Sequence, residues 1–177
     1  MRAIGFHGTS VERAERILAA GFRASRNDYD WLGDGVYFFQ DAPGRAREWA
    51  AERFGSEAAV VGAEIDLTDC LDLLDPRWHR VIANAHRDLV ARGERLQQPL
   101  PRQTTGARRL DRAVINYAVD LMADDGLVIR SVRGAFEEGP PIFPGSALRT
   151  RSHVQIAVRD SSALMRIWLE GGADARS

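Results

Sequence analysis

The sequence predicts a single domain of the α+β class. Its 177 residues are 45% hydrophobic and 28% charged, which is ordinary for a globular domain long enough to bury its own core. Segments typical of strands and of helices follow one another without the strict alternation of a doubly wound sheet. Because no internal repeat or linker is visible, we expect one domain over residues 1–177.

Residues 1–55 contain two strands and two helices. Thr9 or Ser10 can serve as the N-cap of the first helix, Gly21 is a plausible C-terminal stop, and Ile17 and Leu18 are expected to face the core. The second strand combines aromatic and β-branched residues, and the loop before it is rich in turn formers. In order, the elements are a strand at 2–8, a helix at 9–22, a loop at 23–35, a strand at 35–39 and a helix at 42–55.

Residues 58–170 alternate apolar runs with two further helical segments. Pro76 suits the first turn of a long helix. The penultimate strand shows apolar and polar residues in alternation. In order, the elements are a strand and turn at 58–75, a helix at 76–96, a loop at 97–109, a helix at 109–126, a strand at 127–136, a loop at 137–151 and strands at 152–160 and 163–170.

The composition excludes several classes of function. All 24 basic residues are arginine and none is lysine, which reflects either codon usage or resistance to lysine-directed modification. Because Schiff-base and P-loop chemistry need a lysine, both are excluded. Cys70 is the single cysteine, and His79 and His86 lack a third ligand, so we expect no disulfide and no metal. A net charge of −1 argues against nucleic-acid binding by bulk charge, although not against a local basic patch.

The residues at the start of the chain give no sign of a signal peptide, and no apolar run reaches the length of a membrane span. We therefore expect a cytoplasmic protein without a membrane partner, or one delivered by a route that the sequence does not reveal.

Two short stretches carry the residues suited to binding a small ligand. In FHGTS, His7 is followed by Gly8, whose backbone can approach a flat ligand closely, and by Thr9, whose hydroxyl can hold a carboxamide or a ribose. In WLGDGVYFFQ, Tyr37 follows the turn that ends at Gly35, so its ring can form one wall of a slot. We expect the two stretches to face each other.

Over residues 4–50 these motifs resemble the ADP-ribosyltransferases of the histidine–tyrosine–glutamate class, which include the poly(ADP-ribose) polymerases and the diphtheria-toxin-like enzymes. The matching stretches are FHGTS, ILAAGF and DWLGDGVYFFQDAPGRAREWA, in the family's order and spacing. The closing part, residues 132–160, matches more loosely, and residues 55–125 contribute little. The resemblance implies an ADP-ribosyltransferase-like split β-sandwich with peripheral helices, and NAD as co-substrate.

The resemblance also implies roles for individual residues. His7 would bind the hydroxyls of the ribose on the adenosine side of NAD, Gly8 would pair with the nicotinamide carboxamide, and Tyr37 would stack on the nicotinamide ring. Trp49 is the nearby aromatic that can stack on the other face, while Arg45 stands where many relatives have a serine. The residues that would bind NAD are His7, Gly8, Thr9, Gly35, Tyr37, Trp49 and Arg133.

The third position of the family's catalytic set is where this chain departs from it. The closing strand puts Gln155 where the family has glutamate. Glutamine can orient the 2′-hydroxyl of the ribose, but it supplies neither negative charge nor a base. The substitution therefore favours mono-ADP-ribosylation over polymer formation. Either Glu137 or Glu138 supplies the missing carboxylate, or both are solvated loop charges; the catalytic candidates are His7, Tyr37, Gln155 and Glu138.

Three other groups are further candidates for binding. Arg133 reaches a pyrophosphate or forms a surface ion pair. His153 shares a strand face with Gln155 and is a candidate for contact with the acceptor. The arginines of loop 97–109 are a solvated loop or a site for nucleic-acid phosphates; they are Arg102, Arg108 and Arg109.

The sequence thus predicts an enzyme, an NAD-dependent mono-ADP-ribosyltransferase that modifies a protein or nucleic-acid acceptor and releases nicotinamide. A compact single domain would suit a toxin or defence effector with an antitoxin or immunity partner. The alternatives are a catalytically inactive NAD- or ADP-ribose-binding module, an RNA 2′-phosphotransferase-like enzyme and a transferase that modifies a small molecule.

Overall fold

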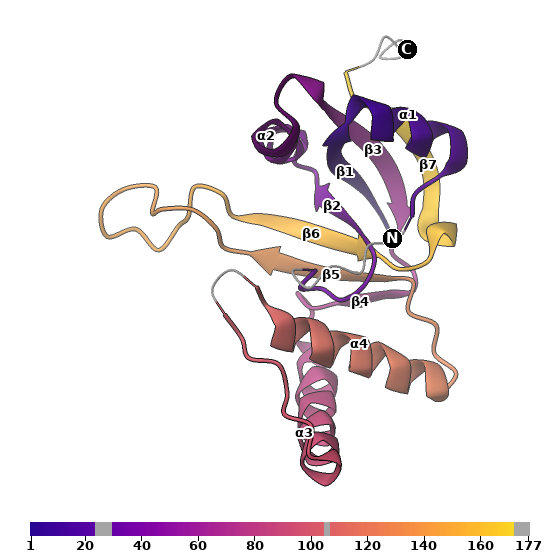
Figure 1. Ribbon diagram of the computed structural model, residues 1–177, viewed down its shortest axis with the longest axis vertical. Helices are drawn as coiled ribbons and strands as arrows, with labels where there is room; N and C mark the ends of the chain where they lie inside the picture. Colours follow the sequence, from indigo (N-terminus) through magenta and orange to yellow (C-terminus); the bar gives the residue numbers. More distant parts are fainter. Residues whose placement is uncertain (24–29, 105–106, 172–177) are drawn as a thin grey trace.

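The computed structural model describes residues 1–23, 30–104 and 107–171, and it confirms the α+β class (Figure 1). Within these ranges the strands form one seven-stranded mixed sheet in the order β4-β5-β6-β2-β1-β3-β7. The strands are β1 (Arg2–Ser10), β2 (Val36–Gln40), β3 (Ala58–Asp66), β4 (Cys70–Asp72), β5 (Ser131–Phe136), β6 (His153–Val158) and β7 (Leu164–Leu169). The helices are α1 (Val11–Ala20), α2 (Pro43–Phe54), α3 (His79–Leu96) and α4 (Arg109–Asp124), with 3₁₀ turns at Gly55–Glu57, Pro76–Trp78 and Ser161–Ala163.

The sheet is divided at the boundary between β1 and β2. All nine residues of β1 pair with β3, but β1 and β2 share only the pairs Gly5–Gln40 and Phe6–Phe39. The strands on the two sides of this boundary run in different directions (Figure 1). The sheet therefore consists of a β1–β3–β7 half and a β2–β6–β5–β4 half, joined by a short junction.

Hydrophobic clusters anchor the helices to the two halves. Ile115 of α4 and Val132 of β5 belong to the cluster between the β2–β6–β5–β4 half and helices α3 and α4. Phe38 and Ile156 belong to a second cluster among the strands. Ala46 of α2 belongs to a third cluster that includes residues of β1, β2 and β3, so α2 is fixed to the β1 side of the division.

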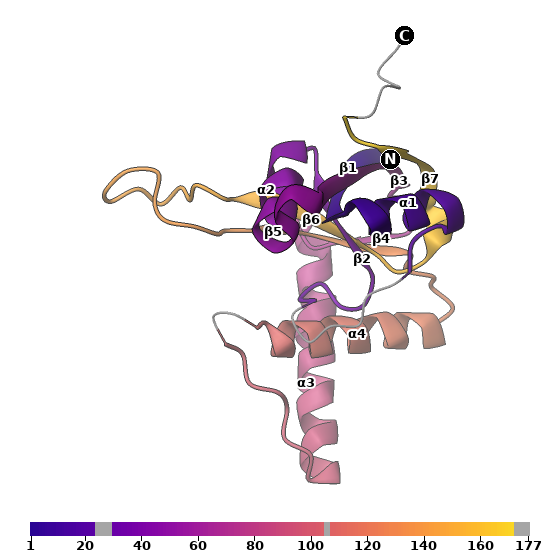
Figure 2. The ribbon, with the colours of Figure 1, turned by 45° about the horizontal axis from the view of Figure 1, so that its top comes forward.

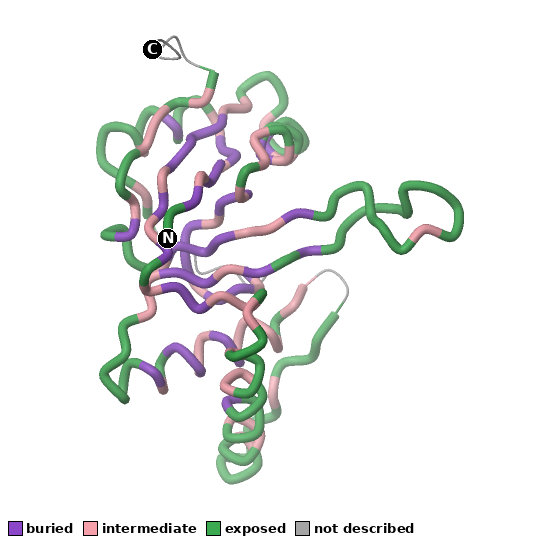
Figure 3. The backbone as a smooth tube through the Cα atoms, turned by 180° about the vertical axis from the view of Figure 1, so that it is seen from behind, coloured by how far each residue is buried: buried purple, intermediate pink, exposed green. Residues whose placement is uncertain are grey.

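Two segments project from this core. The arm (residues 137–152, between β5 and β6) extends away from the sheet, and α3 extends beyond α4 (Figures 1 and 2). Figure 3 shows that most of the buried backbone lies in the strands, whereas the arm and the far end of α3 are exposed. The arm's base is held by the N–H of Arg151, which donates to the carbonyl of Glu138 at 3.0 Å.

Several local predictions need correction. Thr9 is the penultimate residue of β1, and the N-cap of α1 is Ser10, whose hydroxyl accepts from the N–H of Arg13. Leu18 is 40% exposed, because α1 buries Ala14 and leaves only Ile17 of the predicted pair partly covered. Pro76 begins a 3₁₀ turn rather than the helix itself. The arginine-rich loop and the polar loop before β2 lie partly outside the described residues.

Candidate active site

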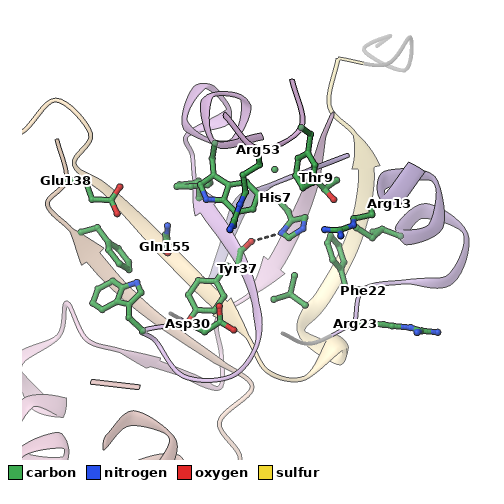
Figure 4. Close-up of a pocket in the computed structure, with 18 of the residues that line it drawn as sticks. His7, Thr9, Arg13, Phe22, Arg23, Asp30, Tyr37, Arg53, Glu138 and Gln155 are labelled. Atoms are coloured by element: carbon green, nitrogen blue, oxygen red, sulfur yellow. Dashed lines mark hydrogen bonds between the residues drawn. The ribbon is translucent and has the colours of Figure 1, made fainter. Parts of the chain in front are cut away.

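A cavity of about 1610 Å³ opens where the two halves of the sheet diverge (Figure 4). Residues of β1, β2, β6, α1 and α2 line it, together with the segment before β2 and the base of the arm. His7 and Tyr37 therefore stand on neighbouring strands and face one cavity, as FHGTS and WLGDGVYFFQ predict.

His7 spans the division of the sheet with its side chain. Its Nδ1 lies 2.9 Å from the backbone carbonyl of Tyr37; since a carbonyl only accepts, Nδ1 carries the proton and Nε2 is left as an acceptor. Burial lowers the pKa of His7, and the charge of Arg13 acts in the same direction. At neutral pH the ring is uncharged and can accept a hydrogen bond from a ligand hydroxyl.

The contact made by His7 explains why Gly8 is open to a ligand. β1 and β2 pair at Gly5–Gln40 and Phe6–Phe39. If this register continued for two more residues, Gly8 would lie opposite Tyr37. The N–H of Asp41 donates to the carbonyl of Ile4, and backbone groups point to the same side at every second residue. The N–H and C=O of Gly8 therefore point toward β2, but the Tyr37 carbonyl that would have accepted from the Gly8 N–H is taken by His7. One donor and one acceptor face the cavity side by side.

Packing on α2 is a second reason for glycine at position 8. A Cβ built on Gly8 would lie 2.5 Å from the carbonyl oxygen of Ala46 and 3.1 Å from the ring of Trp49. No side chain fits there without moving α2. The same closeness puts the indole of Trp49, which also lines the cavity, directly against the Gly8 backbone.

Tyr37 uses its hydroxyl to hold the segment before β2. The hydroxyl donates to the carbonyl of Gly33 and accepts from the N–H of Leu32, both at 2.8 Å. Burial raises the pKa of Tyr37, and the charge of Asp30 adds to the effect, so the phenol stays neutral. The part of Tyr37 available to a ligand is its ring.

Gln155 is oriented by the histidine two residues before it. His153 Nδ1 donates to the carbonyl of Arg151, which leaves Nε2 to accept from the side-chain N–H of Gln155 at 2.9 Å. Burial lowers the pKa of His153, in keeping with a neutral ring. The Gln155 side-chain nitrogen is thereby committed, and its oxygen remains as the acceptor on a residue that lines the cavity. His153 is buried against Phe136 and Phe39, so its role is to position Gln155 rather than to meet an acceptor.

Glu138 lies at the rim of the cavity, where it pairs with Arg45 of α2 at 3.3 Å. Arg45 also binds Glu48 at 2.5 Å. At the other strand of the arm's base, Arg151 pairs with Glu52 of α2 at 2.9 Å. Two ion pairs thus join the base of the arm to α2, and the carboxylate of Glu138 takes part in one of them.

Two of the predicted NAD-binding residues are not among those that line the cavity. The guanidinium of Arg133 binds Asp72 at 2.8 Å and Gln40 at 2.7 Å, so the ion-pair reading holds and the pyrophosphate reading does not. Gly35 packs on β6, since a Cβ there would lie 2.8 Å from the carbonyl oxygen of Val158. Thr9, in contrast, is buried and lines the cavity as expected.

The structure adds lining residues that sequence reasoning missed. Arg13 projects from the first turn of α1 toward the side of the cavity where His7 lies (Figure 4). Its position one turn after the HGTS motif was the signal available in the sequence. Asp30 and Trp31 also line the cavity, although their segment read only as a polar loop.

Comparison with models of known protein families finds no match, and comparison with curated proteins finds no relative. The resemblance to ADP-ribosyltransferases therefore rests on the sequence motifs alone. Among the described residues no cluster of histidine, cysteine or carboxylate side chains fits a metal ion, and no described helix is long and apolar enough to cross a membrane.

Proposed function

We propose that this protein is an NAD-dependent mono-ADP-ribosyltransferase with an ADP-ribosyltransferase-like split β-sandwich fold. The observation that carries the proposal is the opening between β1 and β2, where the free N–H and C=O of Gly8 lie beside two aromatic residues, Tyr37 and Trp49. A carboxamide on a flat aromatic ring is the complement of this arrangement, because it offers one acceptor and one donor in the plane of the ring. Nicotinamide has this form.

The remaining residues suit the two riboses of NAD. The Nε2 atom of His7 and the side-chain oxygen of Gln155 are both acceptors. His7 would receive a hydrogen bond from the ribose on the adenosine side, and Gln155 would receive one from the 2′-hydroxyl of the ribose next to nicotinamide. As nicotinamide leaves with the electron pair of its bond to the ribose, positive charge develops at the anomeric carbon. The oxygen of Gln155 would place a partial negative charge beside it, which is weaker support than a carboxylate would give.

This arrangement supports transfer of a single ADP-ribose. Polymer growth would need a base to activate the hydroxyl of a bound ADP-ribose, and Gln155 is not one. The acceptor would be a protein or a nucleic acid, and the physiological role that of a toxin or defence effector with an antitoxin or immunity partner.

The test is release of nicotinamide from NAD. The protein is incubated with NAD and with cell extract as the source of acceptors, and the released nicotinamide is measured by chromatography. We expect release by the unmodified protein and none by His7→Ala, because the substitution removes the acceptor for a ribose hydroxyl and frees the Tyr37 carbonyl. His86→Ala, on an exposed residue of α3, is the matched control and should be as active as the unmodified protein. Absence of release from protein that binds NAD would overturn the transferase assignment.

A second candidate, an inactive NAD- or ADP-ribose-binding module, is favoured by one observation. Gln155 lacks a carboxylate, and that of Glu138 pairs with Arg45. Calorimetry showing tight NAD binding without any turnover would select this alternative.

A further inference from the structure

The cavity continues beyond the residues assigned to NAD. Its volume of about 1610 Å³ exceeds the ~300–1,000 Å³ of most pockets for one small ligand. Beyond Gln155 it is lined by Trp31, Arg108 and Phe136, which we call the second subsite. The cavity therefore has room for an acceptor group beside the dinucleotide.

The second subsite lies next to Gln155. Gln155 of β6 pairs with Gly134 of β5, and a Cβ built on Gly134 would lie 3.6 Å from the indole of Trp31. Phe136 follows on β5 and stacks on His153, the residue that orients Gln155. A group bound here would stand beside the carbon that loses nicotinamide.

The chemistry of the subsite is that of a platform for a flat ring. The guanidinium carbon of Arg108 lies 4.7 Å from the Trp31 ring centre and 5.6 Å from that of Phe136. An aromatic face and a planar cation together match the π face of a nucleobase.

The charge of the cavity favours a polyanion over a basic protein side chain. Six arginines line it (Arg13, Arg16, Arg23, Arg53, Arg108 and Arg151), against the three acids Asp30, Glu137 and Glu138. Arg16 and Arg151 are paired with Glu12 and Glu52, which lie outside the lining, but arginines still outnumber carboxylates around the cavity, whereas the whole chain carries a net charge of −1. An arginine or lysine acceptor would be repelled, whereas phosphates would be attracted.

We propose that the second subsite binds a nucleobase of a single-stranded nucleic acid and presents it as the acceptor of ADP-ribose; this rests on the proposed function. A base nitrogen that carries a hydrogen gives its lone pair to the anomeric carbon. The bond from that carbon to nicotinamide breaks, neutral nicotinamide leaves with the electron pair, and the base releases one proton to water. A single strand is required because a stacked and paired base cannot reach the subsite.

The first experiment measures binding without turnover, by fluorescence anisotropy of labelled DNA and RNA oligonucleotides of mixed sequence. We expect single strands to bind more tightly than the matched duplexes, and Arg108→Ala to weaken single-strand binding about tenfold, the effect of losing one stacking partner. Arg108→Lys should also weaken it, because lysine keeps the charge and loses the plane. The exposed Arg102 does not line the cavity, so Arg102→Ala should change binding far less than Arg108→Ala does.

The second experiment supplies labelled NAD with each oligonucleotide, or with a denatured protein extract, and follows both nicotinamide release and the fate of the label. We expect label on a single strand, the DNA and RNA arms telling which sugar is accepted, and we expect Trp31→Ala to lower incorporation and Trp31→Phe to restore part of it. Nicotinamide release with label only on protein would overturn the nucleobase proposal and leave the proposed function intact. No release would overturn the proposed function. Single-strand binding that Arg108→Ala leaves unchanged would overturn the subsite independently.

Discussion

Gln155 and His153 act as one unit, in which a neutral imidazole decides how the amide is turned. A carboxylate at position 155 has no N–H to offer, so it would face the lone pair of His153 Nε2 at hydrogen-bond distance. The pair becomes favourable only when His153 takes up a proton and donates instead. The identity of residue 155 is thus tied to the protonation state of its neighbour.

We predict that Gln155→Glu preserves or raises NAD cleavage chiefly below neutral pH, because a new carboxylate raises the pKa of His153 and the protonated ring restores the contact. Gln155→Ala should slow the reaction by raising the activation free energy about 1–3 kcal/mol, because one hydrogen bond in the transition state is lost. Rates of NAD hydrolysis across pH 5.5–8.5 check both. If Gln155→Ala and Gln155→Glu both match the unmodified protein, Gln155 is not at the reacting centre.

Two histidines, His7 and His153, predict how stability depends on pH. Burial lowers the pKa of His7 and of His153 in the folded protein, while in the unfolded chain histidine titrates near ~6.5. Below that pH the unfolded chain binds more protons, so stability falls as the pH drops from about 6.5 through the lower folded-state values. Urea unfolding between pH 8 and 5.5 should show this loss, and His153→Gln should reduce its slope. An unchanged slope would show that burial does not shift this group.

At the scale of elements, the contact between β1 and α2 depends on a glycine. Gly8→Ala should destabilise the protein by about 1–3 kcal/mol, because the new methyl group would meet the Ala46 carbonyl. Gly44 lies in α2 itself with nothing within 4 Å of a built Cβ, so Gly44→Ala should be neutral or stabilising by up to ~1 kcal/mol. Thermal unfolding of the two variants gives the comparison. Equal stability of both would contradict the close packing described above.

Helix α4 positions the turn before β2, the strand that carries Tyr37. Asn116 accepts from the backbone N–H of Asp34 at 3.0 Å and from Arg159 at 2.7 Å, and it donates to the Asp34 carboxylate at 3.2 Å. Asp34 is also held by Arg112 at 2.6 Å. One side chain therefore links α4, β6 and the turn before β2.

We predict that Asn116→Ala costs about 1–3 kcal/mol of stability, because it leaves the part-buried N–H of Asp34 without its acceptor, and raises the KM for NAD more than it lowers kcat. Asn84 of α3 is exposed and accepts from Arg87 of the same helix, so Asn84→Ala should change neither quantity. Chemical denaturation and steady-state kinetics separate the two effects. A fall in kcat at unchanged KM would place Asn116 in the chemistry rather than in positioning.

Comparison of sequence and structure shows what each kind of pattern can predict. The HGTS and GDGVYFF stretches are local, so their elements and their common cavity followed from the residues. The freedom of the Gly8 backbone did not, since it arises from a register that stops after Phe6 and from the insertion of His7. Arg133 was misjudged because its partner, Asp72, reaches it through the pairing of β4 with β5.

At the scale of the whole molecule, the two halves of the sheet meet through a short junction and through the ion pairs Arg45–Glu138 and Glu52–Arg151. In one pair α2 supplies the arginine, and in the other it supplies the glutamate. Exchanging the two charges of a pair can therefore test whether these pairs hold the cavity closed. Glu52→Arg should weaken NAD binding by about 0.2–1 kcal/mol, and Glu52→Arg with Arg151→Glu should recover it. Calorimetry at low salt and at 0.5 M salt should show the effect fade. No recovery in the double variant would mean that the pair does not couple the halves.

The strand order has a consequence for the protein's synthesis. Tyr37 lies on β2, whose neighbours are β1 and the much later β6, and Gln155 comes into register with Phe39 only when β6 is in place. His7 leaves the ribosome early, but the side of the cavity that holds Phe136, Glu138 and Gln155 comes from segments made much later. A chain still being translated would therefore hold every early motif and yet have an incomplete cavity, so under the proposed function it would not consume NAD until β6 had emerged.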